Sequence, residues 1–309
     1  MRTKSSVKRR MEGRALFGAI EAGGTKFVCG IGDDRGRIVD QITIPTTVPE
    51  ETLGRVAEYF QDKAIRALGL GCFGPLDLDP ASPTYGFLTS TPKLAWRGFN
   101  ILANLRRRLA VPIAIDTDVN AAILAEHRWG AAQGLHTALY LTVGTGIGGG
   151  ILVEGQILHG MMHPEAGHVI VRRAAGDNFP GVCPAHGDCL EGMASGPAIE
   201  KRWGSKGRDL PLDHPAWDLE AGYLAQGLVT YICVLSPQRI LLGGGVMQQA
   251  DLFPRIRQKV REMLNGYIQR PEIVANIDEY IVPPGLGTKS GLCGGLALAM
   301  KATEARKEG

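Results

Sequence analysis

Residues 16–31 read LFGAIEAGGTKFVCGI, two apolar runs separated by the turn Gly23-Gly24-Thr25-Lys26. Apolar runs joined by a glycine-rich turn predict antiparallel strands, and a second turn at 33–36 leads into a third apolar run over 38–44. Backbone N–H groups and a threonine hydroxyl at such a turn can approach a phosphate closely. The stretch therefore predicts a three-stranded meander and a candidate phosphate-binding loop.

The same order returns about 120 residues later, which indicates an internal structural repeat. Residues 138–153 read ALYLTVGTGIGGGILV, and an acidic Gly turn at 154–155 precedes a third run at 156–158. Gly144, Gly146 and Gly149 match the spacing of a dinucleotide fingerprint, but that fingerprint requires a helix after the glycines and here a predicted strand follows. We exclude an NAD-binding Rossmann unit on this ground.

A third glycine cluster, Gly243-Gly244-Gly245, follows a predicted strand at 239–242. One glycine turn alone would be interpreted as geometry only. Two equivalent turns and this third cluster favour a nucleotide-binding cleft.

The remaining pattern alternates helices and strands. A helix is predicted from Pro49, with its apolar stripe reaching Leu68 and Gly69 at its end. The other predicted helices span about 101–109, 119–132, 195–203, 219–234, 253–264 and 291–305. We expect a two-lobed α/β protein with its active-site cleft between the lobes. The smaller lobe is 15–118 plus about 291–306, the larger lobe is 119–290, and residues 1–14 are a basic, disordered tail.

Composition excludes several classes of protein. The 309 residues are 44% hydrophobic and 21% charged, which is ordinary for a globular chain. The whole chain has a net charge of +3, and its first 14 residues carry +5. The remaining residues therefore have a net charge of −2, so no nucleic-acid partner is expected. The basic first residues lack the apolar run expected of a secretory signal, no apolar run reaches membrane-spanning length, and six cysteines are sparse for a secreted scaffold. These features predict a cytoplasmic protein without a membrane partner.

Asp116 and Asp118 lie where a predicted strand ends and a helix begins. A carboxylate there could accept a hydroxyl proton during phosphoryl transfer. The alternative is an N-cap aspartate, and Asp118 is placed to serve both roles.

Cys183, His186 and Cys189 form the most specific local motif. Such a cluster in a cytosolic chain predicts a zinc site, which needs one more ligand. His168 is the nearest candidate, with His163 and His159 as rivals on spacing alone.

Glu165 and Glu191 flank this loop. They could hydrogen-bond a polyhydroxylated substrate or be solvated surface acids, and spacing does not separate the two.

Together these residues resemble the ROK family (repressor, open reading frame, kinase) of sugar kinases, over about 17–299. Glu21 to Lys26 resembles its first phosphate loop, 141–150 its second, and 242–246 its adenosine loop. Residues 165–168 with 189–192 resemble the family signature. The resemblance implies an actin-like, hexokinase-type ATPase fold (ribonuclease H-like). It implies ATP contacts at Gly23, Gly24, Thr25, Lys26, Gly144, Thr145, Gly146, Gly148, Gly243, Gly244 and Gly245.

The resemblance also implies Asp118 as the catalytic base and Mg²⁺ bound with ATP. A structural zinc is implied at His168, Cys183, His186 and Cys189. Sugar contacts are implied at Glu165, His168, Glu191, Gly74, Lys93 and Thr117. A homodimer is the family expectation.

Four departures from the family's glucokinases resemble its fructokinase branch. Thr117 and Lys93 replace asparagines, Glu21 replaces an aspartate, and the metal motif has Cys/His/Cys instead of three cysteines. The expected reaction is fructose to fructose 6-phosphate, with mannose, another hexose or an N-acetylhexosamine as alternatives. A sugar-sensing ROK regulator without catalysis is the alternative of another class. With only 14 residues before the smaller lobe, we do not expect the DNA-binding domain of the family's repressors.

Overall fold

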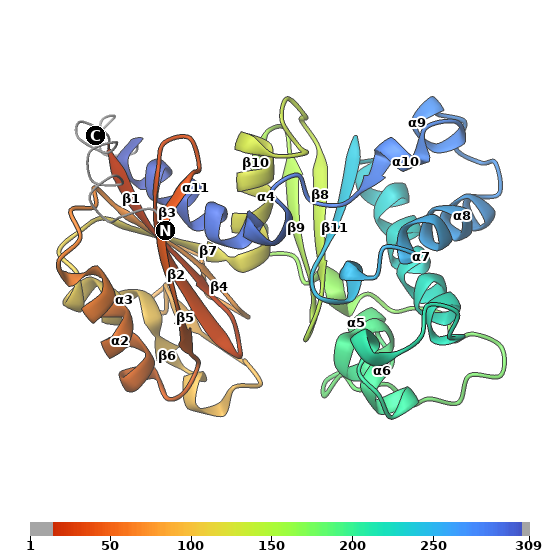
Figure 1. Ribbon diagram of the computed structural model, residues 1–309, viewed down its shortest axis with the longest axis horizontal. Coiled ribbons are helices and arrows are strands. Elements are labelled where there is room, and N and C mark those ends of the chain that lie inside the picture. The colour runs from red at the N-terminus through yellow and green to blue at the C-terminus, as the bar shows by residue number, and fades with distance from the viewer. Residues whose placement is uncertain (1–14, 305–309) are drawn as a thin grey trace, which may run out of the picture. The chain divides into compact units, whose positions relative to one another are not determined.

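The computed structural model describes residues 15–304, which divide into two compact units. Within that range the first unit contains residues 15–130, 159–163 and 289–304, and the second contains 131–158 and 164–288. Figure 1 shows a separate sheet in each unit.

The first unit is built on a five-stranded sheet in the order β3-β2-β1-β4-β7. Its elements are β1 (Leu16–Ala22), β2 (Lys26–Asp33), β3 (Ile38–Pro45), α2 (Pro49–Gln61), β4 (Leu68–Cys72), β5 (Phe87–Leu88), β6 (Phe99–Asn100), α3 (Ile101–Arg108), β7 (Ile113–Thr117), α4 (Asp118–Trp129) and α11 (Ser290–Glu304).

The second unit repeats this topology in the order β10-β9-β8-β11-β12. Its elements are β8 (Ala138–Val143), β9 (Ile147–Val153), β10 (Gln156–Ile157), α5 (Leu190–Ala194), α6 (Gly196–Trp203), α7 (Ala216–Leu235), β11 (Arg239–Gly243), α8 (Leu252–Leu264), α9 (Pro271–Val274), α10 (Ile277–Tyr280) and β12 (Ile281–Val282). In both sheets an antiparallel meander is extended by two parallel strands. The predicted repeat is confirmed.

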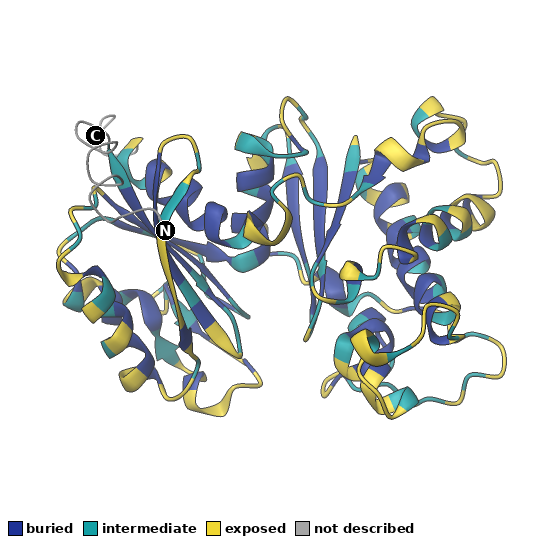
Figure 2. Ribbon diagram, in the orientation of Figure 1, coloured by how far each residue is buried: buried dark blue, intermediate teal, exposed yellow. Residues whose placement is uncertain are grey.

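Alternation along β1 explains how its sheet is covered on both faces. Phe17 and Ala19 pack in one cluster with Leu292 and Leu296 of α11. Ile20 and Ala22 belong to the opposite cluster, which includes apolar residues of α2 and α3. Figure 2 shows most of β1 buried and the outer side of α2 exposed. A strand buried on both faces needs helices on each side, and the chain supplies them.

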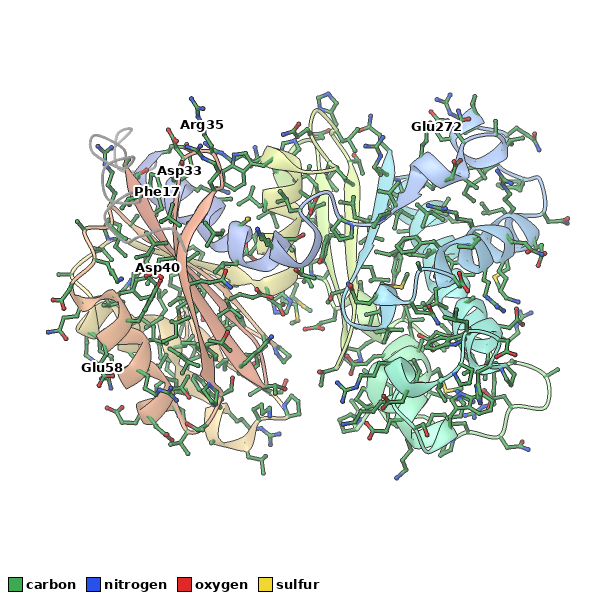
Figure 3. The ribbon with its side chains drawn as sticks, in the orientation of Figure 1. Phe17, Asp33, Arg35, Asp40, Glu58 and Glu272 are labelled. Carbon is green, nitrogen blue, oxygen red and sulfur yellow. The ribbon has the colours of Figure 1, made fainter. Side chains whose placement is uncertain are left out.

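The predicted turn after β2 is held by its own aspartate. The Asp33 Oδ1 atom accepts hydrogen bonds from the backbone N–H groups of Arg35 and Arg37 at 3.1 and 3.2 Å. Figure 3 labels Asp33 and Arg35 at this end of β2. Such side-chain-to-backbone bonds are typical of aspartate in turns.

The predicted extent of the first helix is wrong. Helix α2 ends at Gln61, and Leu68 and Gly69 lie in β4. Arg66 N donates to Leu16 O, and Gly18 N donates to Ala67 O. Pairing with β1 therefore satisfies the backbone that the helix would have used.

The division into units falls after residue 130, whereas we predicted a boundary after 118. Helix α4 joins the first unit, where the buried Ser290 hydroxyl of α11 donates to Glu126 Oε1 at 2.7 Å. The basic tail predicted at 1–14 lies outside the described residues. No helix within 15–304 is long and apolar enough to cross a membrane.

Candidate active site

The first glycine loop is a tight turn between β1 and β2. Gly23 N donates to Lys26 O at 3.0 Å, and the Thr46 hydroxyl donates to Gly23 O at 2.7 Å. Glu21 lies just before the turn. Burial raises the pKa of its carboxyl group above the ordinary value, and the charge of Lys26 opposes that rise. The structure thus gathers a carboxylate and a lysine at a turn whose backbone can bind phosphate.

Lys93 lies beside this turn. A Cβ atom added to Gly24 would stand 3.3 Å from Lys93 Cε. The backbone of Lys93 is fixed, because its N–H donates to the Thr91 hydroxyl and its carbonyl accepts from Trp96 N. A residue predicted to contact the sugar is therefore next to a predicted phosphate loop.

Asp118 is the first residue of α4 and directly follows β7. Its Oδ1 accepts from Val119 N at 2.9 Å. The N-cap is Thr117, whose hydroxyl accepts from Asn120 N at 3.1 Å. Thr117 is buried and performs the capping function that sequence reasoning offered as the alternative role of Asp118.

Asp116 is the buried centre of a polar cluster that the sequence did not reveal. Its Oδ1 accepts from Thr117 N at 2.8 Å and from Asn120 Nδ2 at 2.7 Å. His159 Nε2 lies 3.2 Å from that oxygen and 3.1 Å from Oδ2. Alternation along β7 puts Asp116 on the face of Ala114, opposite the two isoleucines of this strand, so nothing in the sequence indicated that this carboxylate is buried.

Gly74 lies in the loop after β4, against His163. A Cβ atom on Gly74 would be 3.4 Å from His163 Cε1, and His163 Nε2 accepts from Leu76 N at 3.0 Å. His159 and His163 are thus occupied within the first unit.

The second glycine hairpin joins β8 to β9 in the second unit. Gly144 N donates to Gly146 O at 2.8 Å, and Gly144 O accepts from Gly196 N at 2.7 Å. Ile147 N donates to Glu191 Oε2 at 2.8 Å. Glu191 therefore fixes the hairpin, a role not expected from sequence. Gly148 lies within β9 and not in the turn.

Gly244 follows β11 with φ = +93°, and a Cβ atom there would stand 2.3 Å from Val143 O. Only glycine combines this conformation with so close a backbone approach.

A cavity of about 760 Å³ in the second unit lies beside this loop. A separate cavity of about 400 Å³ lies elsewhere in the same unit. The larger one is lined by residues that include Gly144, Thr145, Lys206, Trp217, Gly245 and Val246. Two predicted ATP loops thus share one cavity.

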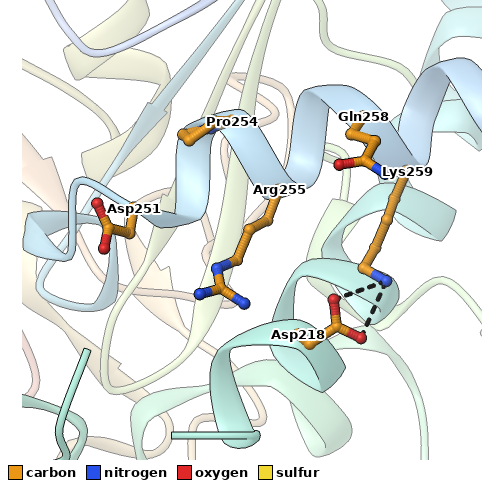
Figure 4. Close-up of a pocket in the computed structure, with 6 residues that line it drawn as sticks. All are labelled: Asp218, Asp251, Pro254, Arg255, Gln258 and Lys259. Carbon is orange, nitrogen blue, oxygen red and sulfur yellow. Dashed lines mark hydrogen bonds and ion pairs between the residues drawn. The ribbon is translucent and has the colours of Figure 1, made fainter. Parts of the chain in front are cut away.

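The smaller cavity holds no residue predicted to contact ligand. Figure 4 shows it along α8, where Lys259 forms an ion pair with Asp218 of α7 at 3.0 Å. Asp251, Pro254, Arg255 and Gln258 complete its lining.

The predicted zinc ligands come together. Ligand atoms of His168, Cys183, His186 and Cys189 all lie within 4.8 Å of one another. His168 Nδ1 is 3.6 Å from Cys183 Sγ and 3.5 Å from Cys189 Sγ, and His186 Nδ1 is 3.6 Å from Cys183 Sγ. Of the three candidate fourth ligands, the structure places His168 in this cluster.

Glu165 lies on the other side of the His168 ring. Its Oε2 is 3.9 Å from His168 Nε2. Partial burial, and secondarily the charge of Glu191, raise the pKa of Glu165 to about 7. The two acids predicted to bind sugar are thus close enough to affect each other.

Two sheets of one repeated topology, each with a glycine hairpin, define the class: a two-lobed α/β fold of the hexokinase type. The ROK family model matches residues 17–302, and the chain belongs to the ROK family.

Named relatives cover nearly the whole chain. A fructokinase of Pediococcus pentosaceus is 46% identical over 93% of this chain and 98% of its own length. A fructokinase of Zymomonas mobilis is 42% identical over 94% and 98%. The solved structure of a Streptomyces griseus ROK glucokinase, in complex with glucose and AMPPNP, is 25% identical with a TM-score of 0.75, covering 94% of this chain and 100% of that one.

Proposed function

We propose that the protein is an ATP-dependent fructokinase that makes fructose 6-phosphate. The observation that carries this proposal is the 38–49% identity to fructokinases over most of the chain. Three relatives named glucokinase are less similar, at 25–27% identity.

Asp118 is the proposed general base. Its carboxylate takes the proton of the fructose 6-hydroxyl while that oxygen attacks the γ-phosphorus of ATP and ADP leaves with the bond electrons. Thr117, and not Asp118, is the N-cap of α4.

ATP is proposed to contact the turn at 23–26 and the cavity lined by Gly144, Thr145 and Gly245. Mg²⁺ would neutralise its phosphates, and Glu21 is the carboxylate placed to support it. Glu165, His168 and Glu191 are proposed for the sugar, with Gly74, Lys93 and Thr117.

The four-residue cluster is proposed to hold a structural zinc. Zn–S bonds of about 2.3 Å and Zn–N bonds of about 2.0–2.1 Å at tetrahedral angles place sulfur and nitrogen ~3.6 Å apart. The separations of 3.5–3.6 Å fit that value. The Nε2 side of His168 faces Glu165, as metal-bound histidines commonly face a carboxylate. Zinc would thereby order the signature loop.

A cytoplasmic location is proposed because none of the six cysteines, all within the described residues, forms a disulfide, which suits a reducing compartment. The homodimer implied by the family resemblance is a further proposal that sedimentation of the purified protein tests.

The proposal is tested by coupled measurement of ADP release with Mg-ATP and fructose, glucose, mannose or N-acetylmannosamine. We expect turnover on fructose and poor turnover on glucose. Preference for mannose or an N-acetylhexosamine would keep the kinase and overturn the specificity. If folded, zinc-loaded protein releases no ADP with any of these sugars, the alternative of a non-catalytic, sugar-sensing regulator would be favoured.

A further inference from the structure

Residues 159–163 lie between two stretches of the second unit in the sequence, yet their contacts place them in the first unit. Histidines stand at both ends of this segment, which we call the histidine strap. Met161, in its middle, is 99% exposed. The strap is therefore fixed to the first unit through its ends.

Each end of the strap contacts an element that carries a proposed substrate residue. At one end His163 accepts from Leu76 N, in the loop that contains Gly74. At the other end His159 contacts Asp116, two residues before Asp118.

The contact with Asp116 reaches the first turn of α4. Asp116 Oδ1 binds both Thr117 N and Asn120 Nδ2, so one carboxylate spans the junction of β7 and α4. Asn120 is fully buried, and its Oδ1 has no hydrogen-bond partner among the described residues. The bond through Nδ2 therefore fixes this amide.

A buried carboxylate acting as a clamp needs donors to offset its desolvation. Thr117 N and Asn120 Nδ2 supply two. His159 supplies the third, and it is the only one of the three from outside the β7–α4 junction.

We propose that His159 is a positioning residue for phosphoryl transfer, acting through Asp116 and Asn120 to hold the β7–α4 junction so that Asp118 meets the sugar hydroxyl. This inference rests on the proposed kinase function. His159 touches neither reactant; it fixes the turn that carries the base.

The charge state of His159 provides a readout. Asp116 of β7 raises the pKa of His159 through a hydrogen bond, while partial burial and Lys301 of α11 lower it. Asn120 of α4 faces it as a neutral group. Below its raised pKa the imidazolium donates a charge-assisted bond to Asp116, and above it the weaker neutral bond remains. The wild-type kcat should fall modestly as pH rises through this ionisation.

The test uses steady-state kinetics of the full chain with fructose and Mg-ATP. His159→Ala should lower kcat at least about tenfold, since small misplacements of reacting groups have effects of this size or larger. Both KM values should stay within about twofold, because the residue that His159 positions, Asp118, is proposed to act in proton transfer and not in substrate binding. His159→Gln, whose amide can still donate to Asp116, should retain most of kcat and lose the ionisation from the pH profile. Met161→Ala is the matched control and should be neutral.

A double-mutant cycle tests the route of the effect. If His159 acts through Asp116, His159→Ala adds little to Asp116→Asn. Wild-type kcat in His159→Ala, equal losses in the Ala and Gln variants, or additive losses in the cycle would each overturn the inference. If His159→Ala does not fold, the pH profile of His159→Gln tests the inference, and an ionisation that persists in this variant would overturn it. Absence of turnover in the wild type would instead refute the proposed function.

Discussion

Replacement of Asp118 by Asn separates the chemistry of this residue from its structural role. Asn keeps the size of the side chain and an oxygen that can accept from Val119 N at the observed 2.9 Å. Thr117 caps the helix in either case. The variant loses a negative charge in the first turn, which is worth about 0.3–1 kcal/mol. We expect the melting temperature to fall by no more than about 4 °C.

The effect on catalysis should be far larger. A general base contributes about 10²–10⁴-fold, which is ~2.7–5.4 kcal/mol of activation free energy. kcat for fructose should fall by this factor, while the fructose dissociation constant from calorimetry stays nearly unchanged. Asp34→Asn, at an exposed turn residue, is the control and should behave as wild type. An Asp118→Asn enzyme with most of its turnover would refute Asp118 as the base.

Three further predictions address the metal, the nucleotide site and pH. Cys183→Ser should lower bound zinc, measured by elemental analysis, from about one per chain to little, because one thiolate ligand is lost. Gly291→Ala should raise the KM for Mg-ATP or lower kcat by about tenfold, because its Cβ would stand 2.4 Å from Glu21 Cδ. Burial raises the pKa of Glu220 well above 4.5, so the folded state holds this proton at pH values where the unfolded state has lost it. The contribution of Glu220 to stability should therefore fall as pH rises above 4.5, by up to about 1.4 kcal/mol per pH unit, and Glu220→Gln should lack this contribution in denaturant titrations compared with wild type.

Each of these has a contrary result. Unchanged zinc content would remove Cys183 from the ligands. For the nucleotide site the control is Gly54→Ala, in open space within α2, which should only gain about 0.5–1 kcal/mol of stability. Equal kinetics of the two alanine variants would contradict the role of Glu21. If the free energy of unfolding depends on pH in the same way in wild type and Glu220→Gln, the raised pKa of Glu220 would be contradicted.

The repeated meander could be predicted because its signals are local. Glycine turns at 23–24 and 144–146 separate apolar runs, and each strand pairs with its neighbour in the chain. The end of α2 could not be predicted in this way. The stripe of Ala64, Ile65 and Leu68 suits a helix, but pairing of Arg66 and Ala67 with β1 depends on a distant part of the fold.

The short elements were also missed. β5, β6, α5, α9, α10 and β12 have two to five residues, too few to show a period. In the site, the close spacing of Cys183, His186 and Cys189 was enough to predict a metal cluster. His159 could not be distinguished from His168 by spacing, because its partner Asp116 lies 43 residues earlier.

The central claim is transfer of the γ-phosphoryl group of ATP to the 6-hydroxyl of fructose. The most direct measurement is identification of the product by ³¹P and ¹³C NMR after incubation of the zinc-loaded protein with Mg-ATP and fructose. The account predicts stoichiometric ADP and fructose 6-phosphate. Fructose 1-phosphate, or ADP with inorganic phosphate and unchanged fructose, would contradict it.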